Sequence, residues 1–575
     1  MPLLAAAIAA VLTLPSLTAG LALDDFFHAI RARGGDLQGA SRFDLFRFAS
    51  GSPADVAAGR DIGFLPWFAS GELKLAFWRP VSSLSHWVDY NYLRAWPWLM
   101  HLESVLWYAA LVGLAALLYR RVLAPAWVGG LAALLYAVDD AHGLPVAWIG
   151  NRNAVIGVAF GMASLLAHDR WRRDGWRLGA ALGPLLLAAG LLSAEAALAA
   201  IAYHASYALF LDRASRGRRV VSLVPYGGVV VAWQLAYRAL GYGASGSGFY
   251  IDPVRDPWLY LASVPKRAGV LLLAQLLTPP SDVAAWLSPT RTIVLLVWAV
   301  AVLAWTAWVT APLVARDPVA RFFLLGALLA VLPVCATLPS DRLLFFVGFG
   351  AMGLVAQVLA ALTCGAAWRP TARIWVRPAR GLGFAWIVGH LMVSPLALAL
   401  TSAFATRAAD RMVTDGIARL AIGPEMRSQI LVVVNTPDLL RGIYGFVIPR
   451  DASSHPPLGT RILSATFSTV AVTRTDAYTI AVRPKEGFLH DATSALLSSD
   501  REPMHLGQTV RLAGMTAEVT EMNAAGRPAE ASFRFGVPLE DPSLRWVAWD
   551  GAYFRDFTPP PVGTQVVVGV EGFVL

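Results

Sequence analysis

Long apolar runs recur along this chain and limit what it can fold into. A helix of about 20 apolar residues spans the hydrocarbon core of a bilayer, which is roughly 30 Å thick. Hydrophobic residues make up 57% of the chain, charged residues make up 15%, and the mean hydropathy is +0.55. These values exceed what the core of a soluble protein needs. The sequence therefore predicts a polytopic α-helical membrane protein.

We expect about eleven crossings and one further segment that does not cross. The expected spans are residues 2–23, 98–118, 124–139, 147–168, 178–194, 195–212, 219–240, 292–314, 320–339, 343–365 and 382–404. Residues 258–277 are apolar enough to cross, but Lys266 and Arg267 fall in their middle. A crossing there would also place the later arginine-rich loops on the wrong side. This segment is therefore interpreted as re-entrant or interfacial.

Arginine residues indicate the orientation. Short loops that are rich in arginine alternate with loops that are not, and the arginine-rich loops lie near residues 120–121, 170–177, 213–219, 316–321 and 369–380. The positive-inside rule assigns these loops and the N-terminus to the cytoplasm, and everything after residue 405 to the outside. We expect the protein to lie in a bacterial inner membrane, and the arginine-rich, lysine-poor usage and the alanine content suggest a high-GC bacterium. The net charge of +9 then reflects orientation, and nucleic-acid binding is not expected.

The first apolar range has an alternative interpretation as a cleaved signal peptide. Gly20-Leu21-Ala22 would serve as a cleavage site. However, residues 1–4 carry no basic side chain, and the apolar run is long for a signal core. We therefore expect a retained helix.

Two pairs of aspartates lie at the expected outer boundary. Asp24 and Asp25 follow the first apolar run, and Asp139 and Asp140 follow the third. Carboxylates at a membrane boundary cost free energy unless they face a polar cavity, so they indicate a functional site. Paired carboxylates suggest general-base or cation-binding chemistry on a lipid-borne substrate. The structural alternative is that they cap a helix or end a span with solvated charge.

The composition divides the chain into three expected domains. Residues 1–404 would form the transmembrane module, whose external loop 24–97 carries short amphipathic helices in the interface. Residues 405–427 would form a helical connector, and residues 428–575 a β-rich periplasmic domain, either a sandwich or an open barrel. Alternating β-branched stretches support the last assignment: 430–434, 468–473, 478–482, 509–512, 531–535 and 565–570.

Five short motifs occur in order along residues 1–360: Trp78-Arg79-Pro80-Val81-Ser82, His101-Leu102, Val146-Ala147-Trp148-Ile149-Gly150-Asn151-Arg152, Leu192-Ser193-Ala194-Glu195 and Asp341-Arg342-Leu343-Leu344. Together with the first acid pair, they resemble the GT-C glycosyltransferases that use polyprenyl-phosphate sugars. The resemblance is greatest to the protein O-mannosyltransferase-like branch, including bacterial relatives of the tetratricopeptide-carrying enzymes. The tetratricopeptide repeats themselves are not in this sequence, and the β-rich region lies outside the resemblance.

The chain departs from that branch at two places. The branch usually has His-Pro-x-His-x-Glu where this chain has Asp139-Asp140-Ala141-His142, with Leu144 at the glutamate position. Ala194 stands where lysine is common. The departures leave three alternatives: the second acidic function has moved to Asp139 or Asp140, the acceptor differs, or the chain is a catalytically silent relative.

The resemblance implies inverting transfer of a sugar from a polyprenyl-phosphate donor to a hydroxyl of a glycan, lipid or protein at the extracytoplasmic face. Such transfer needs a base for the acceptor proton and positive charge for the leaving phosphate. We expect Asp25 or Asp24 to be the base. The candidates for phosphate binding are Arg152, Lys266, Arg267 and Arg342.

The remaining acidic candidates would serve the acceptor or a cation. Asp139, Asp140 and His142 are expected to bind the acceptor or a divalent ion. A Mg²⁺ or Mn²⁺ ion, if one is used, would have Asp25, Asp139 and Asp140 as its ligands.

Two other classes of protein remain open. A lipid-linked sugar flippase would distribute charged residues along the depth of the bundle, whereas the expected spans here are nearly free of charge. An O-antigen polymerase or ligase tends to carry its large external loop late in the chain, and here that loop lies between the first two spans. Both patterns favour an outward-facing transferase. The sequence does not indicate which sugar or acceptor it uses.

Overall fold

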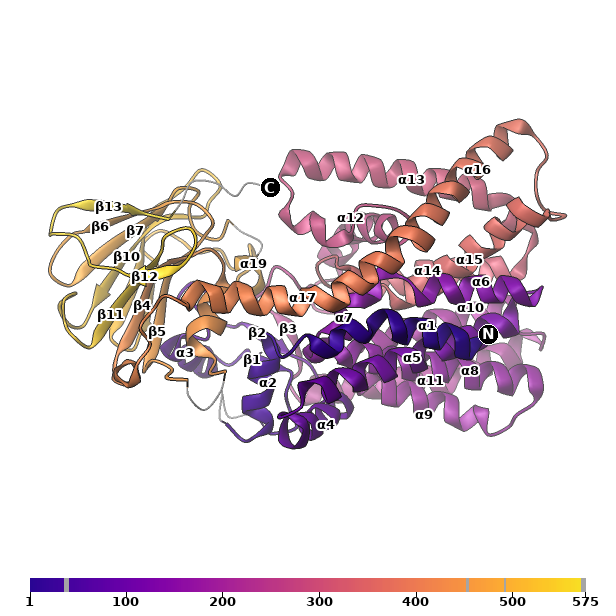
Figure 1. Ribbon diagram of the computed structural model, residues 1–575, viewed down its shortest axis with the longest axis horizontal. Helices are drawn as coiled ribbons and strands as arrows, with labels where there is room; N and C mark the ends of the chain where they lie inside the picture. Colours follow the sequence, from indigo (N-terminus) through magenta and orange to yellow (C-terminus); the bar gives the residue numbers. More distant parts are fainter. Residues whose placement is uncertain (36–40, 451–453, 491–492, 570–575) are drawn as a thin grey trace.

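The structure is a computed structural model that describes residues 1–35, 41–450, 454–490 and 493–569. Figure 1 shows a body of helices at one end of the long axis and β-sheets at the other end. The N-terminus lies in the helical body, and most strands belong to the C-terminal part of the chain. The fold is therefore mostly helical with a C-terminal β-sheet region.

Six helices in the described part of the chain are long and apolar enough to cross a membrane. They are α5 (Pro97–Val122), α8 (Arg152–Asp174), α11 (Arg216–Ala239), α13 (Pro289–Arg316), α15 (Phe345–Cys364) and the continuous helix Arg373–Ile417. Shorter apolar helices are α1 (Pro2–Thr13), which a 3-10 turn continues to Thr18, α6 (Ala126–Ala137), α9 (Gly179–Leu191) and α14 (Pro318–Val334). These helices indicate a multi-pass membrane protein, while the count of about eleven crossings stays a prediction.

Each expected span overlaps a helix, although the spans 2–23 and 320–339 extend about five residues past the helical part. The range 195–212 corresponds to a 3-10 turn (Glu195–Ala199) followed by α10 (Ala200–Phe210). The range 258–277, expected to re-enter or lie at the surface, is one unbroken helix of 20 residues, α12 (Pro257–Leu276). Its position relative to a bilayer stays a prediction.

The helices α8 and α15 form the centre of the helical body, since most of their surface is buried. Small residues let the central helices approach closely. A Cβ added at Gly350 of α15 would lie 2.5 Å from the carbonyl oxygen of Phe323 in α14. By contrast, α11 and α13 expose most of their apolar surface, which suits contact with lipid.

One long helix connects the helical body to the β-sheets. A π-helical stretch (Ile387–Val393) joins α16 (Arg373–Trp386) to α17 (Ser394–Ile417), giving 45 continuous residues. At 1.5 Å per residue this helix is about 68 Å long. Figure 1 shows α17 reaching the β region. The expected connector, residues 405–427, is therefore helical up to Ile417, because α17 continues the preceding span without a break.

The long loop between α1 and α5 contains both helices and strands. Its helices are α2 (Asp24–Ala32), α3 (Pro53–Ile62) and α4 (Pro80–Val88). The sequence predicts these helices but not the three-stranded antiparallel sheet of β1 (Arg47–Ser50), β2 (Lys74–Ala76) and β3 (Gly243–Ser245). The third strand comes from the distant segment after α11, so no local pattern marks the pairing.

The C-terminal region contains a six-stranded antiparallel sheet in the order β13-β6-β7-β10-β9-β8 and a four-stranded sheet in the order β12-β11-β4-β5. In the second sheet, β11, β4 and β5 are parallel neighbours. The bounds are β4 (Ile430–Thr436), β5 (Gly459–Ala465), β6 (Val470–Arg474), β7 (Thr479–Pro484), β8 (Thr509–Leu512), β9 (Met515–Met522), β10 (Pro528–Phe535), β11 (Leu544–Trp549), β12 (Phe554–Asp556) and β13 (Gln565–Val568). Two single-turn helices are α18 (Leu439–Gly442) and α19 (Ser494–Leu497).

All six predicted β stretches contain strand residues, although Val570 at the end of the last one lies outside the described residues. The sequence-based prediction missed β5, β9, β11 and β12. In β5 all seven residues are buried, so the alternation of polar and apolar residues that marks a half-exposed strand is lost. The two sheets share a hydrophobic core, as expected for a β-rich domain.

The external loop belongs to that same core. Trp67 is buried in it, donates its indole N–H to the carbonyl oxygen of Leu463 (2.9 Å), and contacts the rings of Phe488 and Phe533 edge-on. Gly63 lies so close to β5 that an added Cβ would be 2.6 Å from the carbonyl oxygen of Thr460. The expected boundaries at residues 404 and 428 therefore do not separate two independent cores.

Candidate active site

The first acid pair lies at the start of α2. Leu23 adopts a left-handed backbone conformation (φ 47°) and turns the chain from the end of α1 into α2. Asp24 and Asp25 then occupy the first turn of α2, where the free N–H groups of the helix favour negative charge. Positive φ is uncommon outside glycine and persists where the surrounding packing fixes it.

Asp25 is completely buried, and its carboxylate accepts three hydrogen bonds. Its Oδ1 accepts from the backbone N–H of Gly150 (2.6 Å) and from the hydroxyl of Tyr90 (3.4 Å), and its Oδ2 accepts from the backbone N–H of Ala22 (2.9 Å). Burial raises the pKa of Asp25 to about 7, although these hydrogen bonds act in the opposite direction. Asp25 is thus a rigidly held carboxyl group that titrates near neutral pH.

Asp24 is partly buried, and one of its two carboxylate oxygens accepts no hydrogen bond among the described residues. Its Oδ1 accepts a hydrogen bond from the hydroxyl of Tyr444, which lies in the turn Ile443–Val447 of the C-terminal region. Within the described residues, its Oδ2 accepts none. Burial raises the pKa of Asp24, while the Tyr444 hydroxyl and the positive charge of Arg342 lower it to a smaller extent. Segments 420 residues apart in the sequence therefore meet at this carboxylate.

Arg342 is the cation that acts on Asp24. It lies in a 3-10 turn (Asp341–Leu343) between α14 and α15, and its guanidinium carbon is 5.9 Å from the centre of the Trp148 ring. Among the described residues, no carboxylate lies within ion-pair distance of Arg342. Its charge is therefore available to a ligand, which a phosphate would suit.

Trp148 and Gly150 complete the surroundings of the acid pair. The indole N–H of Trp148 donates to the carbonyl oxygen of Ala22 (3.3 Å), which fixes the ring beside the start of α2. A Cβ added at Gly150 would lie 3.2 Å from Oδ1 of Asp25 and 3.2 Å from Nε1 of Trp148. Glycine at this position therefore permits the close approach of the two segments.

The second acid pair accepts hydrogen bonds from an amide and a hydroxyl, and it lies close to the buried imidazole of His390. Asp139 is buried, and its Oδ2 accepts from the side-chain amide of Gln275 in α12 (2.8 Å). Asp140 begins a 3-10 turn (Asp140–His142), and its Oδ1 accepts from the hydroxyl of Ser394 in α17 (2.6 Å). An amide, a hydroxyl and the imidazole of His390 thus stand beside the second pair, where a tyrosine hydroxyl and a guanidinium stand beside Asp24.

A third carboxyl group links the two pairs. Asp341 accepts from the backbone N–H (2.8 Å) and the hydroxyl (2.6 Å) of Ser281. Burial raises the pKa of Asp341 to about 7, and nearby negative charges, including Asp140, act in the same direction. The turn that carries Arg342 beside Asp24 therefore also carries Asp341 beside Asp140. The two predicted acid pairs border one region of the protein.

His142 lies in the aromatic core instead. Its Nδ1 is 3.0 Å from the hydroxyl of Tyr108, and its ring stacks on Phe345 with 4.5 Å between the ring centres. The side chain is completely buried. Its role in acceptor or cation binding stays a prediction.

Arg152 is engaged in a buried ion-pair network. It is completely buried, forms an ion pair with Asp89, and lies 3.2 Å from a carboxylate oxygen of Glu103. Two carboxylates offset the burial of its guanidinium, so its surroundings are those of a structural residue and differ from the predicted phosphate site. Arg79 of the first motif is likewise paired, with Glu195 at 2.7 Å.

Lys266 and Arg267 lie farther along α12. Lys266 is exposed, and Arg267 donates to the carbonyl oxygen of Cys335 (2.9 Å). Gln275, which reaches Asp139, lies about 12–14 Å farther along the helix axis at 1.5 Å per residue. In the described residues, neither cation contacts either acid pair.

Among the described residues, no group of three or more histidine, cysteine, aspartate or glutamate side chains is arranged to hold a metal ion. The role of Asp25, Asp139 and Asp140 as ligands of Mg²⁺ or Mn²⁺ stays a prediction. Both oxygens of Asp25 already accept hydrogen bonds, which reduces its capacity for a cation.

The sequence did not assign Tyr90, Trp148, Gly150 or Tyr444 to the site. Trp148 and Gly150 lie in a motif that the resemblance marks, so a signal was present for them. Tyr444 lies 420 residues after Asp24, and no local pattern marks it.

No family model matches this chain, and no curated protein sequence matches it. One solved structure that matches is the archaeal oligosaccharyltransferase AglB from Archaeoglobus fulgidus, in complex with an inhibitory peptide and a dolichol-phosphate (11% identity, TM-score 0.38, 70% of this chain and 56% of AglB). Another is ArnT from Cupriavidus metallidurans, bound to undecaprenyl phosphate (16% identity, TM-score 0.33, 75% of this chain and 82% of ArnT). The chain thus spans little more than half the length of AglB. At these scores we assign no residue role by similarity to either protein.

Proposed function

We propose that this protein transfers a sugar from a polyprenyl-phosphate carrier to an acceptor hydroxyl at the extracytoplasmic face of the membrane. The observation that carries the proposal is the juxtaposition of Asp24 and Arg342 at the end of the first apolar helix. A carboxylate with a raised pKa beside a guanidinium that has no ion-pair partner among the described residues supplies a base and a phosphate-binding group together. The motif resemblance to GT-C glycosyltransferases favours the same reaction.

The chemistry follows from these two groups. The acceptor oxygen attacks the anomeric carbon, the bond from that carbon to the carrier phosphate breaks, and the acceptor proton passes to the base. Arg342 stabilises the negative charge that develops on the leaving phosphate. A single displacement of this kind inverts the anomeric configuration.

Asp24 is the better candidate for the base. Its Oδ2 accepts no hydrogen bond among the described residues, whereas both oxygens of Asp25 are engaged. Asp25 is then a positioning residue, because its bonds to Ala22 and Gly150 fix the first turn of α2. We propose that Asp139 and Asp140, which border the same region, orient the acceptor.

The test is donor consumption by the full-length protein in proteoliposomes. A panel of labelled polyprenyl-phosphate sugars is offered to the wild type, to Asp24→Asn and to Asp25→Asn. The matched control is Asp174→Asn, an exposed carboxylate at the end of α8. We expect the wild type to consume one donor and Asp24→Asn to lose about a hundredfold or more of the rate. The control should keep the wild-type rate.

Two outcomes would contradict the proposal. One is an Asp24→Asn variant that folds and still transfers at the wild-type rate. The other is a donor that binds or crosses the liposome membrane without being consumed, which would favour a flippase or a silent relative.

A further inference from the structure

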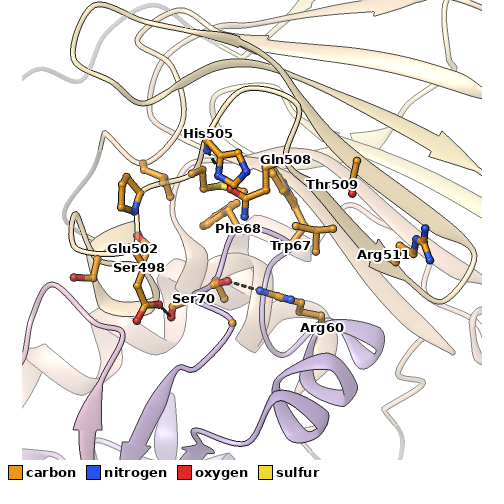
Figure 2. Close-up of a pocket in the computed structure, with 17 residues that line it drawn as sticks. Arg60, Trp67, Phe68, Ser70, Ser498, Glu502, His505, Gln508, Thr509 and Arg511 are labelled. Atoms are coloured by element: carbon orange, nitrogen blue, oxygen red, sulfur yellow. Dashed lines mark hydrogen bonds between the residues drawn. The ribbon is translucent and has the colours of Figure 1, made fainter.

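A cavity of about 400 Å³ lies between the external loop and the C-terminal sheets (Figure 2). Residues 67–71 and the end of α3 form one wall, and residues 498–511 contribute most of the other. The volume falls within the range of small-molecule sites, about 300–1,000 Å³. The cavity shares no lining residue with the candidate active site, so it requires a separate explanation.

Arg60 is a cation in this wall without an anionic partner. One terminal nitrogen donates to the carbonyl oxygen of Ala69, while the buried Nε has no hydrogen-bond partner in the described structure. No carboxylate among the described residues lies within ion-pair distance. Burial lowers the pKa of Arg60, which is the direction expected for a charge that has lost water without gaining a counter-charge. A bound anion would supply the missing partner.

The opposite wall offers hydrogen-bonding groups and a second cation. The side-chain oxygen of Gln508 accepts from the backbone N–H of His505 (3.1 Å), which leaves the amide N–H groups for a ligand. Thr509 and Arg511 also line this wall and are exposed. These side chains suit a ligand with several hydroxyl groups and a negative charge.

Glu502 is the one carboxylate among the described residues that line the cavity. It accepts a hydrogen bond from the hydroxyl of Ser70, which is drawn in Figure 2 together with the bond from Arg60. The lining therefore holds the two guanidinium groups of Arg60 and Arg511 against one carboxylate. Phe68 and Met504 add apolar surface, against which the C–H groups of a sugar ring can pack.

We propose that this cavity binds a single sugar residue that carries an anionic group. The carboxylate or phosphate of the sugar pairs with the planar guanidinium of Arg60, which can bind either group through two parallel hydrogen bonds. Gln508 and Thr509 contact the ring hydroxyls. A neutral sugar leaves Arg60 unpaired and binds more weakly. This proposal does not rest on glycosyl transfer, because binding requires neither a donor lipid nor the acid pairs.

The test measures binding to the full-length protein in lipid nanodiscs by calorimetry. The probes are glucuronate, glucose 6-phosphate and uncharged glucose. We expect the better anionic sugar to bind at least about tenfold more tightly than glucose, as for a gained hydrogen bond to a charged group. Arg60→Gln should reduce its affinity to that of glucose. Arg511→Gln should have a smaller effect, and the exposed Arg555→Gln should have none.

The possible outcomes test the role of the anionic group and the role of the sugar ring separately. The preferred probe, glucuronate or glucose 6-phosphate, identifies the anionic group. Acetate or inorganic phosphate binding as tightly as the sugars would overturn the role of the sugar ring. Glucose binding as tightly as the anionic probes, or a folded Arg60→Gln variant with wild-type affinity, would overturn the role of the charge.

A second pair of variants covers the case in which Arg60→Gln does not fold. Arg60→Lys keeps the positive charge but loses the planar fork, so it should retain part of the preference for anionic sugars. Gln508→Ala should weaken both charged and neutral sugars by a similar factor. If both variants bind all probes as the wild type does, the proposal is wrong.

Discussion

The two acid pairs are alike in sequence but differ in what surrounds them. Each pair follows an apolar helix, and the four aspartates are all buried or partly buried. The first pair faces backbone N–H groups, a tyrosine hydroxyl and the guanidinium of Arg342. The second pair faces a side-chain amide, a hydroxyl, the backbone N–H of Ala141 and the imidazole of His390. A position at the end of an apolar run thus predicts a buried or partly buried carboxylate. The side chains that other segments place around that carboxylate decide its chemistry.

Three arginines also show that partners from other segments decide what a charged side chain can do. Arg152 is surrounded by two carboxylates and is part of the framework, whereas Arg342 and Arg60 have no such partner among the described residues. Only an arginine without a counter-charge has positive charge left for a ligand. The predicted role of Arg152 in phosphate binding stays a prediction, and the sequence alone did not show that this arginine is paired with two carboxylates.

The largest expected difference between the two pairs is in transfer rate. Asp24→Asn removes the proposed base and should lower the rate by about 10²- to 10⁴-fold. Asp140→Asn keeps the size of the side chain and one oxygen acceptor. It should lower the transfer rate no more than about tenfold, as loss of one acceptor contact would. Initial rates of donor consumption in proteoliposomes measure both. Equal losses in the two variants would remove the distinction between the pairs.

Arg342→Gln is expected to have the next largest effect, because it affects both the leaving phosphate and the base. The rate should fall by about 10²-fold, as when one stabilising donor is removed. The charge of Arg342 lowers the pKa of Asp24, so its removal raises that pKa. The acid limb of the pH–rate profile should therefore move to higher pH. Arg255→Gln, which removes an exposed cation, is the control and should leave the profile unchanged.

Asp25 should make stability depend on pH. Its pKa is about 7 in the folded protein and 3.8 without burial, so between these values the folded state holds a proton that the unfolded state has released. The free energy of unfolding then falls as the pH rises through this window. Asp25→Asn should flatten the fall in melting temperature between pH 5 and pH 8, by about a few degrees.

Controls for this measurement come from other carboxyl groups. Asp341, whose pKa is also raised to about 7, should contribute in the same direction, so Asp341→Asn should flatten the curve as well. Asp174 has a lowered pKa because of Arg121, and Asp174→Asn should not flatten it. An unchanged slope in Asp25→Asn would argue against a proton held at this position.

The smallest expected effect comes from removing one hydroxyl group that donates a hydrogen bond to an acid pair. Tyr444→Phe removes one hydrogen bond to Asp24 and should lower the transfer rate by about fivefold. Because that bond lowers the pKa of Asp24, its loss should also move the acid limb to slightly higher pH. Ser394→Ala, the matched change at Asp140, should leave the acid limb where it is. A larger shift in Ser394→Ala than in Tyr444→Phe would reverse the comparison.

Much of the fold follows from apolar runs. Each of the expected spans overlaps a helix, because a run of apolar residues has few other ways to satisfy its backbone in lipid. The half-exposed strands were also predicted, since their side chains alternate. The buried strand β5 and the sheet that includes β3 were not, because burial on both faces removes the alternation and a distant partner leaves no local pattern.

For the candidate site too, the sequence singled out residues, and only the structure shows what surrounds each of them. Sequence alone identified Asp24, Asp25 and Arg342, because a charged residue at a membrane boundary stands out against apolar neighbours. It also marked Arg152 and His142, whose burial in an ion-pair network and an aromatic core only the packing reveals.

By itself, the sequence determined that this is a membrane protein with acid pairs at the expected outer boundary and a β-rich C-terminal region. The tertiary structure decided that the external loop and the C-terminal sheets share one core and that Tyr444 reaches Asp24. It also decided which arginines keep an unpaired charge. The physical reason is that hydrophobicity and local periodicity are properties of a segment, whereas desolvation and charge pairing depend on groups that the chain brings together from far apart.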